Sequence, residues 1–432
     1  MNPRQRLTRG TALGALSVIL LAACGGGSTS TTGASNAGSG AGADGKVTLK
    51  VNFWGDFGLK DLVTKYEAEH PTVKVQLNAG DYNAQHEALQ KSLIAGKGAP
   101  DIAAIDADFV VQFRGQSDKF ANLLDLGAGE YESKYLAWKW KDTLSADGKN
   151  QMGVGTDVGG LAMCYRTDLF KAANLPTDRD QVSALWPTWA QFAEVGKKYT
   201  AATGKPFVDA ASNVMNPVLR QQKVGYFDSD NKLLMDGGPK AAWDIAARFI
   251  ADKTSANLVS FTPEWNAAFK SGKFATLACP AWMQAYIKTQ DPAGAGKWDI
   301  AAVPGGSGNW GGSFWTIPKQ STHSKEAWEF IKWALAPEQQ ISIFKSVGNL
   351  PSQPALYTDP ALLDFKNPYF SNAPVGKIFT EAAKKLEPQY SGKKSGPVRV
   401  AVEAVLTQVQ QGKLTPEAGW EQAKKEAEKA AK

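Results

Sequence analysis

The sequence has few of the residues on which metal centres depend. Only three histidines and three cysteines occur in 432 residues. His70, His86 and His323 lie far apart along the chain, and no Cys or His pair has the spacing of a zinc-ligand motif. We therefore expect no transition-metal site, and the sequence indicates no other cofactor.

A strong excess of one charge is also missing. Of the 48 basic residues, Arg4, Arg6 and Arg9 lie at the very start. The other 45 nearly balance the 42 acidic residues. Nucleic-acid binding needs a concentrated basic face, which this balance does not provide. We expect no nucleic-acid partner.

The sequence has no long apolar run near its start. Residues 13–20 are apolar, but a membrane-spanning helix needs about 18 to 20 such residues. Basic residues precede this run and Leu21-Ala22-Ala23-Cys24 follows it, an order typical of a secretory signal peptide. We therefore assign residues 1–23 to a signal peptide.

The segment Leu21-Ala22-Ala23-Cys24 resembles the lipobox of bacterial lipoproteins. The resemblance implies cleavage before Cys24 and lipidation of its thiol, and the alternative is an ordinary secreted protein with a chance cysteine. Residues 24–45 hold almost only Gly, Ser, Thr and Ala after Cys24, a composition typical of a flexible tether. Gly25 is not the Asp of an inner-membrane retention signal, so we expect attachment to the outer face of the cytoplasmic membrane through lipid alone.

The remaining chain predicts two α/β lobes. It is longer than one domain usually is, which favours two separate cores. At its start, segments with strand-like apolar alternation are followed by segments with helical spacing. This order of strands and helices predicts a parallel sheet with right-handed crossovers. The alternating segments are strands 47–53, 73–77 and 102–105 and helices 59–69 and 84–95.

Glycines next to Asp157 suit a crossing between the lobes, and a glycine-rich loop follows Gly305. We expect an N-terminal lobe of residues 46–156 plus 300–340, and a C-terminal lobe of residues 157–299 plus 341–432. Each lobe is predicted to hold a mainly parallel sheet flanked by helices.

Two cysteines, Cys164 and Cys279, remain after Cys24. Disulfides persist outside the cytoplasm, so a bond between these two is one alternative. Nothing in the sequence shows that their α-carbons lie close enough for it. The prediction is two buried free thiols.

Aromatic and acidic residues follow the three predicted strands. In a parallel sheet the carboxyl ends of the strands meet at one edge, where ligands bind. A single Asp in such a place is more often a helix cap or a turn residue, but convergence from three strands favours a site. The residues are Trp54, Asp56, Asp81, Tyr82, Asp106 and Asp108.

Tryptophan is abundant, with 14 residues, many of them beside Gly, Pro or Asp in predicted loops. A sugar offers an apolar face and a ring of hydroxyls, so its site needs flat aromatic rings and planar hydrogen-bonding groups. We expect Trp54, Trp282 and Trp310 to serve a sugar site. Four tryptophans on predicted helices are expected to pack inward: Trp186, Trp189, Trp328 and Trp333.

An ordered set of segments resembles the extracellular solute-binding proteins (family 1) of carbohydrate-uptake ABC transporters, the group that includes maltodextrin-binding protein. The similarity covers residues 46–432, and the set is specific although no single segment is. The segments are 53–56, 98–102, 165–170, 269–273, 280–282, 311–313, 327–331 and 348–351.

This resemblance implies a two-lobed periplasmic-binding-protein-like fold (type II) with a multi-segment hinge. It also implies a monomer that captures a di- or oligosaccharide between its lobes and delivers it to permease subunits of the transporter. The ligand-binding residues we expect are Trp54, Asp56, Asp106, Asp108, Asp157, Tyr226, Trp265, Trp282, Trp310, Gly311, Gly312 and Arg399. Lys394, Ser395 and Gly396 replace the aromatics that flank the corresponding Arg in the maltodextrin binder, which argues against maltodextrin.

Two alternatives stay open at this point. A glycoside hydrolase needs two carboxylates about 5 to 10 Å apart, and Asp106 and Asp108 are candidates. Nothing marks either acid as desolvated, and a binding site explains the same residues without catalysis. The second alternative is a binding protein for another solute, such as a peptide, a polyamine or ferric ion. The aromatic loops with mixed polar partners favour sugar over both.

Overall fold

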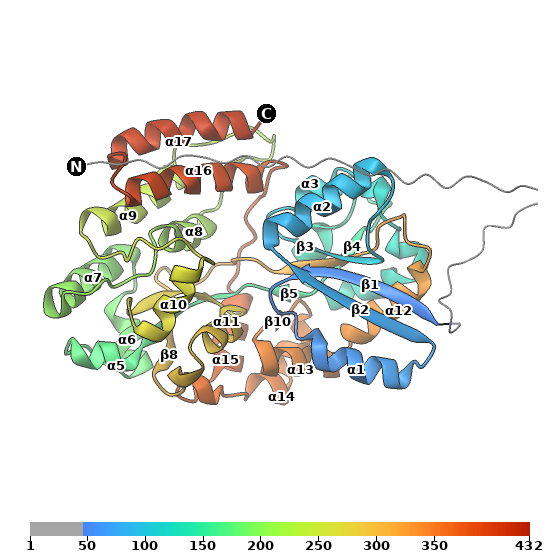
Figure 1. The fold of residues 1–432 in the computed structure, drawn as a ribbon, viewed down its shortest axis with the longest axis horizontal. Helices are drawn as coiled ribbons and strands as arrows, with labels where there is room; N and C mark the ends of the chain where they lie inside the picture. Colours follow the sequence, from blue (N-terminus) through green and yellow to red (C-terminus); the bar gives the residue numbers. More distant parts are fainter. Residues whose placement is uncertain (1–45) are drawn as a thin grey trace, which may run out of the picture. The chain divides into compact units, whose positions relative to one another are not determined.

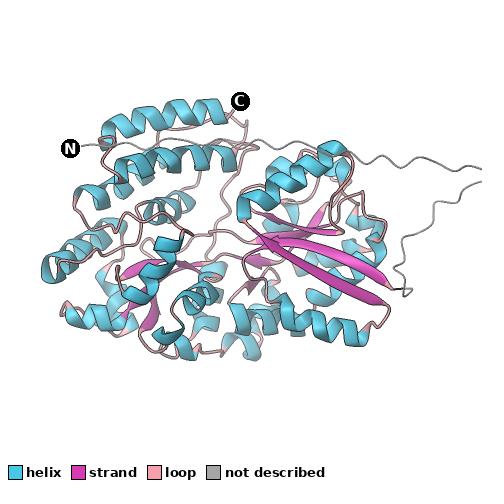
Figure 2. Ribbon diagram, in the orientation of Figure 1, coloured by secondary structure: helices cyan, strands magenta, loops and turns pink. Residues whose placement is uncertain are grey.

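The computed structural model describes residues 46–432. The predicted signal peptide, the lipidation site Cys24 and the tether therefore lie outside the described residues. No helix within the described range is long and apolar enough to span a bilayer. Helices surround separate groups of strands, as Figures 1 and 2 show.

A five-stranded sheet in the order β2-β1-β3-β9-β4 forms the centre of the first lobe. β1, β2 and β3 are parallel, which confirms the prediction from the alternating segments. β9 and β4 add antiparallel strands. The strands are β1 (Val47–Trp54), β2 (Val73–Gly80), β3 (Ile102–Asp106), β4 (Gly153–Gly155) and β9 (Ser313–Thr316). The helices are α1 (Leu59–Glu69), α2 (Tyr82–Ala95), α3 (Val110–Arg114), α4 (Ala137–Lys141) and α12 (Ser324–Ala334).

Helices cover both faces of this sheet because neighbouring residues of a strand point to opposite sides. Ile102 of β3 packs with residues of α1 and α12, whereas Ala103 packs with residues of α2 and α3. All five residues of β3 are buried. The continuous apolar run is therefore that of a central strand.

The second lobe is built on a three-stranded sheet in the order β7-β6-β8. Its strands are β6 (Leu161–Arg166), β7 (Thr276–Pro280) and β8 (Trp298–Ala301). Helices that pack on one face are α5 (Thr167–Ala172), α6 (Arg179–Leu185), α7 (Trp189–Thr203), α8 (Ser212–Arg220), α9 (Gly238–Ala251), α16 (Ser395–Gln410) and α17 (Pro416–Ala430). Those on the other face include α10 (Pro263–Ser271), α11 (Met283–Gln290), α14 (Pro360–Leu363) and α15 (Val375–Lys384).

The prediction of a mainly parallel sheet is wrong for the second lobe. β6 is antiparallel to both β7 and β8. A strand runs parallel or antiparallel to its neighbour according to the end of the sheet at which the chain enters it. The helices that precede the strand decide at which end this happens. Apolar patterning identifies a strand but carries no information about its direction.

The lobes are joined by several crossings, as the fold class predicted. The chain leaves the first sheet after β4, passes through β5 (Asp157–Val158) and enters β6; it returns between β8 and β9. β5 pairs with β10 (Leu350–Pro351), which follows α13 (Pro337–Val347). The precise lobe boundaries given above remain a prediction.

Cys164 and Cys279 form a disulfide, so the prediction of two free thiols is wrong. Both residues are fully buried, and their α-carbons lie 5.3 Å apart. Cys164 lies on β6 and Cys279 on β7, which are neighbouring antiparallel strands. The register of this pairing brings together two residues that are 115 positions apart in the sequence.

Candidate functional site

Asp106 ends β3 and is held by groups of the first lobe. Its carboxylate accepts hydrogen bonds from the Tyr82 hydroxyl at 3.1 Å and from the Asp108 backbone N–H at 2.9 Å. Its backbone N–H donates to Nε2 of His86, whose Nδ1 lies 2.7 Å from the Tyr82 carbonyl. His86 must therefore carry its proton on Nδ1, and its burial lowers the pKa to about 4. A neutral imidazole thus positions Asp106.

Asp108 connects the two lobes. Its Oδ1 accepts from Arg220 at the end of α8, and its Oδ2 lies 2.9 Å from Nε of Arg399 on α16. The Arg399 pair is an ion pair whose N–H direction does not meet hydrogen-bond geometry. Arg399 also donates to Glu403 at 2.8 Å. Asp108 and Glu403 thus balance the charges of Arg220 and Arg399.

The two neighbouring carboxyl groups differ in pKa. Burial, and then the charge of Asp108, raise the pKa of Asp106. Burial alone would raise the pKa of Asp108 as well, but Arg220 and Arg399 lower it. Asp108 is therefore ionised at neutral pH, whereas Asp106 is able to hold a proton and donate it in a hydrogen bond.

The glycine-rich loop brings Asp106 close to Trp282. A Cβ atom on Gly311 would lie 3.1 Å from Nε1 of Trp282 and 3.8 Å from Oδ2 of Asp106. Gly311 has φ +86°, so both its conformation and its surroundings favour glycine. Trp282 is half-buried and donates from Nε1 to the Trp310 carbonyl at 2.9 Å. The ring centroids of these two tryptophans lie 6.1 Å apart in an edge-to-face arrangement.

The same loop is fixed against the hinge. The Trp310 N–H donates to the Gly159 carbonyl at 2.8 Å, and the Gly159 N–H donates to Oδ1 of Asn309 at 2.9 Å. A Cβ atom on Gly159 would lie only 1.9 Å from the Trp310 carbonyl oxygen. Only glycine permits this approach of the two backbones.

Trp54 lies at the end of β1 next to the same polar groups. Its ring centroid is 5.3 Å from that of Tyr82 and 4.6 Å from that of His86. Trp54 is half-buried. Trp54, Asp106, Trp282 and Trp310 therefore form one connected group with aromatic and polar members from both lobes, which we call the interlobe site.

Several predicted site residues lie elsewhere. Trp265 is fully buried in a hydrophobic core and donates to Asp209, so the expectation that it contacts ligand is wrong. It lies on α10, where it shares one buried face with Ala268 and Phe269. Asp56 is exposed and accepts from the Gly58 N–H at 2.8 Å in a local turn. Whether Asp56 contacts ligand stays a prediction.

Tyr226 and Asp157 are buried beside the interlobe site. The Tyr226 hydroxyl has no hydrogen-bond partner among the described residues, and burial, then Glu403, raise its pKa. Asp157 accepts from the Ser313 N–H at 3.0 Å and lies at the hinge, where Gly312 packs against its carbonyl. A ligand role for Tyr226, Asp157 or Gly312 stays a prediction.

Sequence reasoning missed Arg220 and Lys139. Arg220 ends a short helix with no motif around it, so only the tertiary contact with Asp108 reveals it. Lys139 is fully buried, its Nζ has no hydrogen-bond partner among the described residues, and it lies 3.8 Å from the centroid of the Phe314 ring. The run Ala137-Trp138-Lys139-Trp140 offered a weak signal, because a lysine between two tryptophans is unusual on a solvated face.

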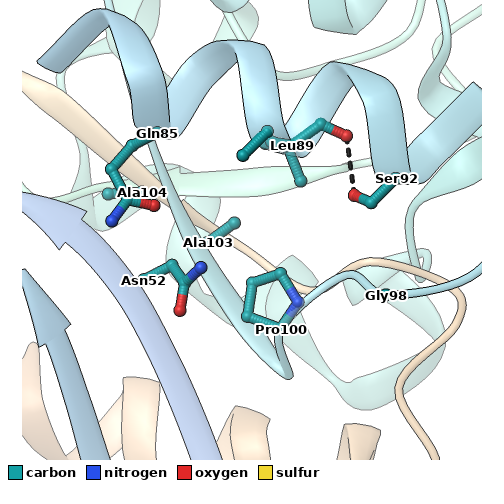
Figure 3. A pocket seen from close by; sticks show the side chains of 9 residues that line it. Asn52, Gln85, Leu89, Ser92, Gly98, Pro100, Ala103 and Ala104 are labelled. Atoms are coloured by element: carbon teal, nitrogen blue, oxygen red, sulfur yellow. Dashed lines mark hydrogen bonds between the residues drawn. The ribbon is translucent and has the colours of Figure 1, made fainter. Parts of the chain in front are cut away.

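Two cavities lie outside the interlobe site. One of 30 Å³ between α2 and β3 has room for a single water and is too small for a sugar. Figure 3 shows its wall, where Ser92 donates to the Leu89 carbonyl at 2.8 Å. It is lined by Asn52, Gln85, Ala88, Leu89, Ser92, Gly98, Pro100, Ala103 and Ala104. A second cavity, of 220 Å³, lies in the second lobe between β8, α6 and α15 and has no aromatic side chain in its wall.

A two-lobed α/β fold with several crossings, and with aromatic and polar groups where the lobes meet, is the architecture of a solute-binding protein. The chain belongs to the family of bacterial extracellular solute-binding proteins, whose family model matches residues 61–367. A solved structure described as extracellular solute-binding protein family 1 is 37% identical, with a TM-score of 0.78. The match covers 89% of this chain and all of that one.

Two relatives of known ligand are similar over most of their length. The arabinooligosaccharide-binding protein of Bacillus subtilis (strain 168) is 28% identical over 67% of this chain and 70% of its own. The lactose-binding protein of Rhizobium radiobacter is 28% identical over 63% of this chain and 66% of its own. The chain thus spans just under two thirds of the length of the second relative.

Proposed function

We propose that this protein is the substrate-binding component of a carbohydrate-uptake ABC transporter and that it holds a di- or oligosaccharide at the interlobe site. The observation that carries the proposal is the meeting of Trp282 and Trp310 with Asp106 around Gly311. The tryptophan rings supply apolar faces, and the carboxyl group supplies a partner for hydroxyls. The names of the two relatives, arabinooligosaccharide-binding and lactose-binding, support a sugar ligand.

We further propose binding without catalysis. The backbone N–H of Asp108 donates to the Asp106 carboxylate at 2.9 Å, and the carboxylate of Asp108 is already paired with two arginines. A hydrolase needs a second carboxyl group that is free to act across the scissile bond, and the carboxylate of Asp108 is occupied by its two arginines. Of the two carboxyl groups, that of Asp106 is therefore the one left to bond a sugar hydroxyl.

The proposed location is the outer face of the cytoplasmic membrane, with Cys24 carrying the lipid anchor and permease subunits of the transporter as partners. Family membership supports a place outside the cytoplasm. The segment Leu21-Ala22-Ala23-Cys24 supports the anchor, and the proposed tether keeps the binding lobes at high effective concentration beside the transporter. Labelling of cells with an alkyne fatty acid would test the anchor, and a Cys24→Ala variant should lose the label.

Trp282→Ala tests the proposed sugar site. We expect sugar affinity to fall about two- to tenfold or more because one stacking face is lost. Isothermal titration with arabino-, galacto- and malto-oligosaccharides measures this. Trp333→Ala is the matched control, since Trp333 lies on α12 and donates to Glu69, away from the interlobe site.

Two results would contradict the proposal. One is stabilisation in a thermal-shift screen by spermidine or a peptide and by no sugar. The other is release of shorter products when the protein is incubated with the same oligosaccharides and the mixture is separated by chromatography. Unchanged affinity of Trp282→Ala would remove Trp282 from the site.

A further inference from the structure

Phe261 is the most exposed aromatic residue in the described range 46–432, with 55% of its surface accessible. It lies in the turn before α10, at a backbone φ of +66°. A bulky residue rarely adopts this left-handed conformation, which is costly for every residue except glycine and, to a lesser extent, Asn and Asp. The position therefore combines an unfavourable backbone with an unfavourable exposure.

The turn itself explains why another residue would fit better. The Thr262 N–H donates to the Val259 carbonyl at 3.4 Å, so Phe261 is the third residue of a four-residue turn. A positive φ at this position favours Gly or Asn. Strain of this kind points to a role for the side chain.

The Phe261 ring continues the aromatic surface of the interlobe site. Its centroid lies 6.5 Å from that of Trp282, with an angle of 30° between the planes. Trp282 in turn contacts Trp310 and lies next to the Asp106 carboxylate across Gly311. Because Phe261 is exposed, its ring extends the aromatic surface at Trp282 into solvent, where a longer sugar chain would pass.

Residues of α10 and α11 pack against the Phe261 ring. Its centroid lies 5.1 Å from that of Trp265 and 5.4 Å from that of Tyr286, and Trp265 is fully buried. The hydroxyl of this Tyr286 donates to Oδ1 of Asn266 at 2.6 Å, which leaves the amide NH₂ of Asn266 as a donor next to Tyr286. An aromatic face with a neighbouring amide is a combination that recognises a sugar unit.

We propose that Phe261 forms a further sugar subsite, which stacks on the glycosyl unit next to the one held at Trp282. The inference rests on the proposed function and makes it more specific: the preferred ligand is an oligosaccharide that extends past Trp282 over the second lobe. Its contribution depends on chain length, because a ligand that ends at Trp282 does not reach Phe261.

The other account of Phe261 is a hydrophobic staple, in which a residue before the helix packs on the first turn. Contact with Trp265 on α10 is compatible with this account. A staple requires apolar bulk, whereas a sugar subsite requires an aromatic face. Phe261→Leu keeps the apolar bulk but removes the aromatic face, and Phe261→Tyr keeps both the bulk and the face.

The experiment is titration calorimetry of the wild type, Phe261→Leu, Phe261→Tyr and Phe261→Asn with arabino- and galacto-oligosaccharides of two to five units. For the longer sugars we expect Phe261→Leu and Phe261→Asn to lose about two- to tenfold in affinity, and Phe261→Tyr to match the wild type. The shortest sugar that binds should bind all four proteins equally. Asn suits a positive φ, so Phe261→Asn should retain the fold, which thermal unfolding verifies.

The outcomes separate this inference from the proposed function. Equal affinity of the wild type and Phe261→Leu at every length, with Trp282→Ala still impaired, would overturn the subsite and leave the proposed function in place. Loss that is the same at every length would also overturn it, because a staple acts through the fold. Absence of binding of both sugar series to the wild type would overturn the proposed function and the subsite together.

Discussion

Asp106 is the residue whose charge is most sensitive to its surroundings. Burial and the neighbouring Asp108 raise its pKa to about 7. An Asp in the unfolded chain titrates near 3.9, so between these values the folded protein binds more protons than the unfolded one. The free energy of unfolding contributed by Asp106 therefore falls as pH rises through this window.

The prediction concerns the wild type compared with Asp106→Asn. From pH 5 to pH 7 the wild type should lose stability relative to the variant, by up to about 1.4 kcal/mol per pH unit. Urea unfolding at several pH values measures the difference. In the unfolded chain His86 also titrates in this range, because its ordinary pKa is 6.5, but both proteins contain it, so its contribution cancels in the comparison. A constant difference across the range would show that Asp106 is ionised throughout.

From the sequence, the residues at the strand ends could be identified more reliably than the role of each residue in the site. It placed Asp106 and Trp54 at one edge because parallel strands end together. Trp186, Trp189 and Trp328 are buried as their helical spacing predicted, and Trp333 is half-buried. The partners of Asp108 could not be predicted, because Arg220 and Arg399 come from helices more than 100 residues away along the chain.

At the element scale, Gly159, which follows β5, packs directly on the glycine-rich loop. Gly159→Ala should strongly destabilise the protein, because its Cβ would lie 1.9 Å from the Trp310 carbonyl oxygen. We expect a loss of about 1 to 3 kcal/mol or more in the free energy of unfolding. We also expect weaker sugar binding, since Trp310 would have to move.

Gly160→Ala is the matched control for this prediction. A Cβ atom on Gly160 meets its nearest neighbour, the Phe379 carbonyl oxygen, at 3.5 Å, which is ordinary contact. Denaturant unfolding of both variants, with sugar titration, gives the comparison. Equal stability of Gly159→Ala and Gly160→Ala would mean that the loop yields easily at this point.

The elements of the first lobe could be predicted because their patterns are local. The helix expected over 59–69 is α1 (Leu59–Glu69), and the three alternating strands are β1, β2 and β3. The second lobe was harder, because its strands are separated by long helical segments and pair with distant partners. Strand direction and the Cys164–Cys279 bond both follow from that long-range pairing.

On the scale of the whole molecule, Asp108 joins the first lobe to α8 and α16 of the second. Asp108→Ala would leave Arg220 and Arg399 buried without this partner, and an unpaired buried charge costs about 3 to 5 kcal/mol. Separation of the lobes would hydrate both guanidinium groups. We therefore predict that the sugar-free variant has a larger radius of gyration than the sugar-free wild type.

Small-angle X-ray scattering measures this prediction. Saturating oligosaccharide should return the variant towards the wild-type radius, because a ligand that contacts both lobes favours the state in which they meet. Asp147→Ala is the control, since Asp147 is exposed and its carboxylate accepts from Ser145 and Lys149 in its own turn of the first lobe. Identical radii for wild type and Asp108→Ala without sugar would show that other contacts hold the lobes together.

By itself the sequence determined the class of fold, the parallel half of the first sheet and the aromatic and acidic composition of the site. These follow from periodicity and residue chemistry, which act over a few neighbouring residues. The tertiary structure alone decided which groups meet: Asp108 with two arginines, Gly311 between Asp106 and Trp282, and Cys164 with Cys279. Such contacts depend on how distant segments pack, and no local pattern in the chain records that.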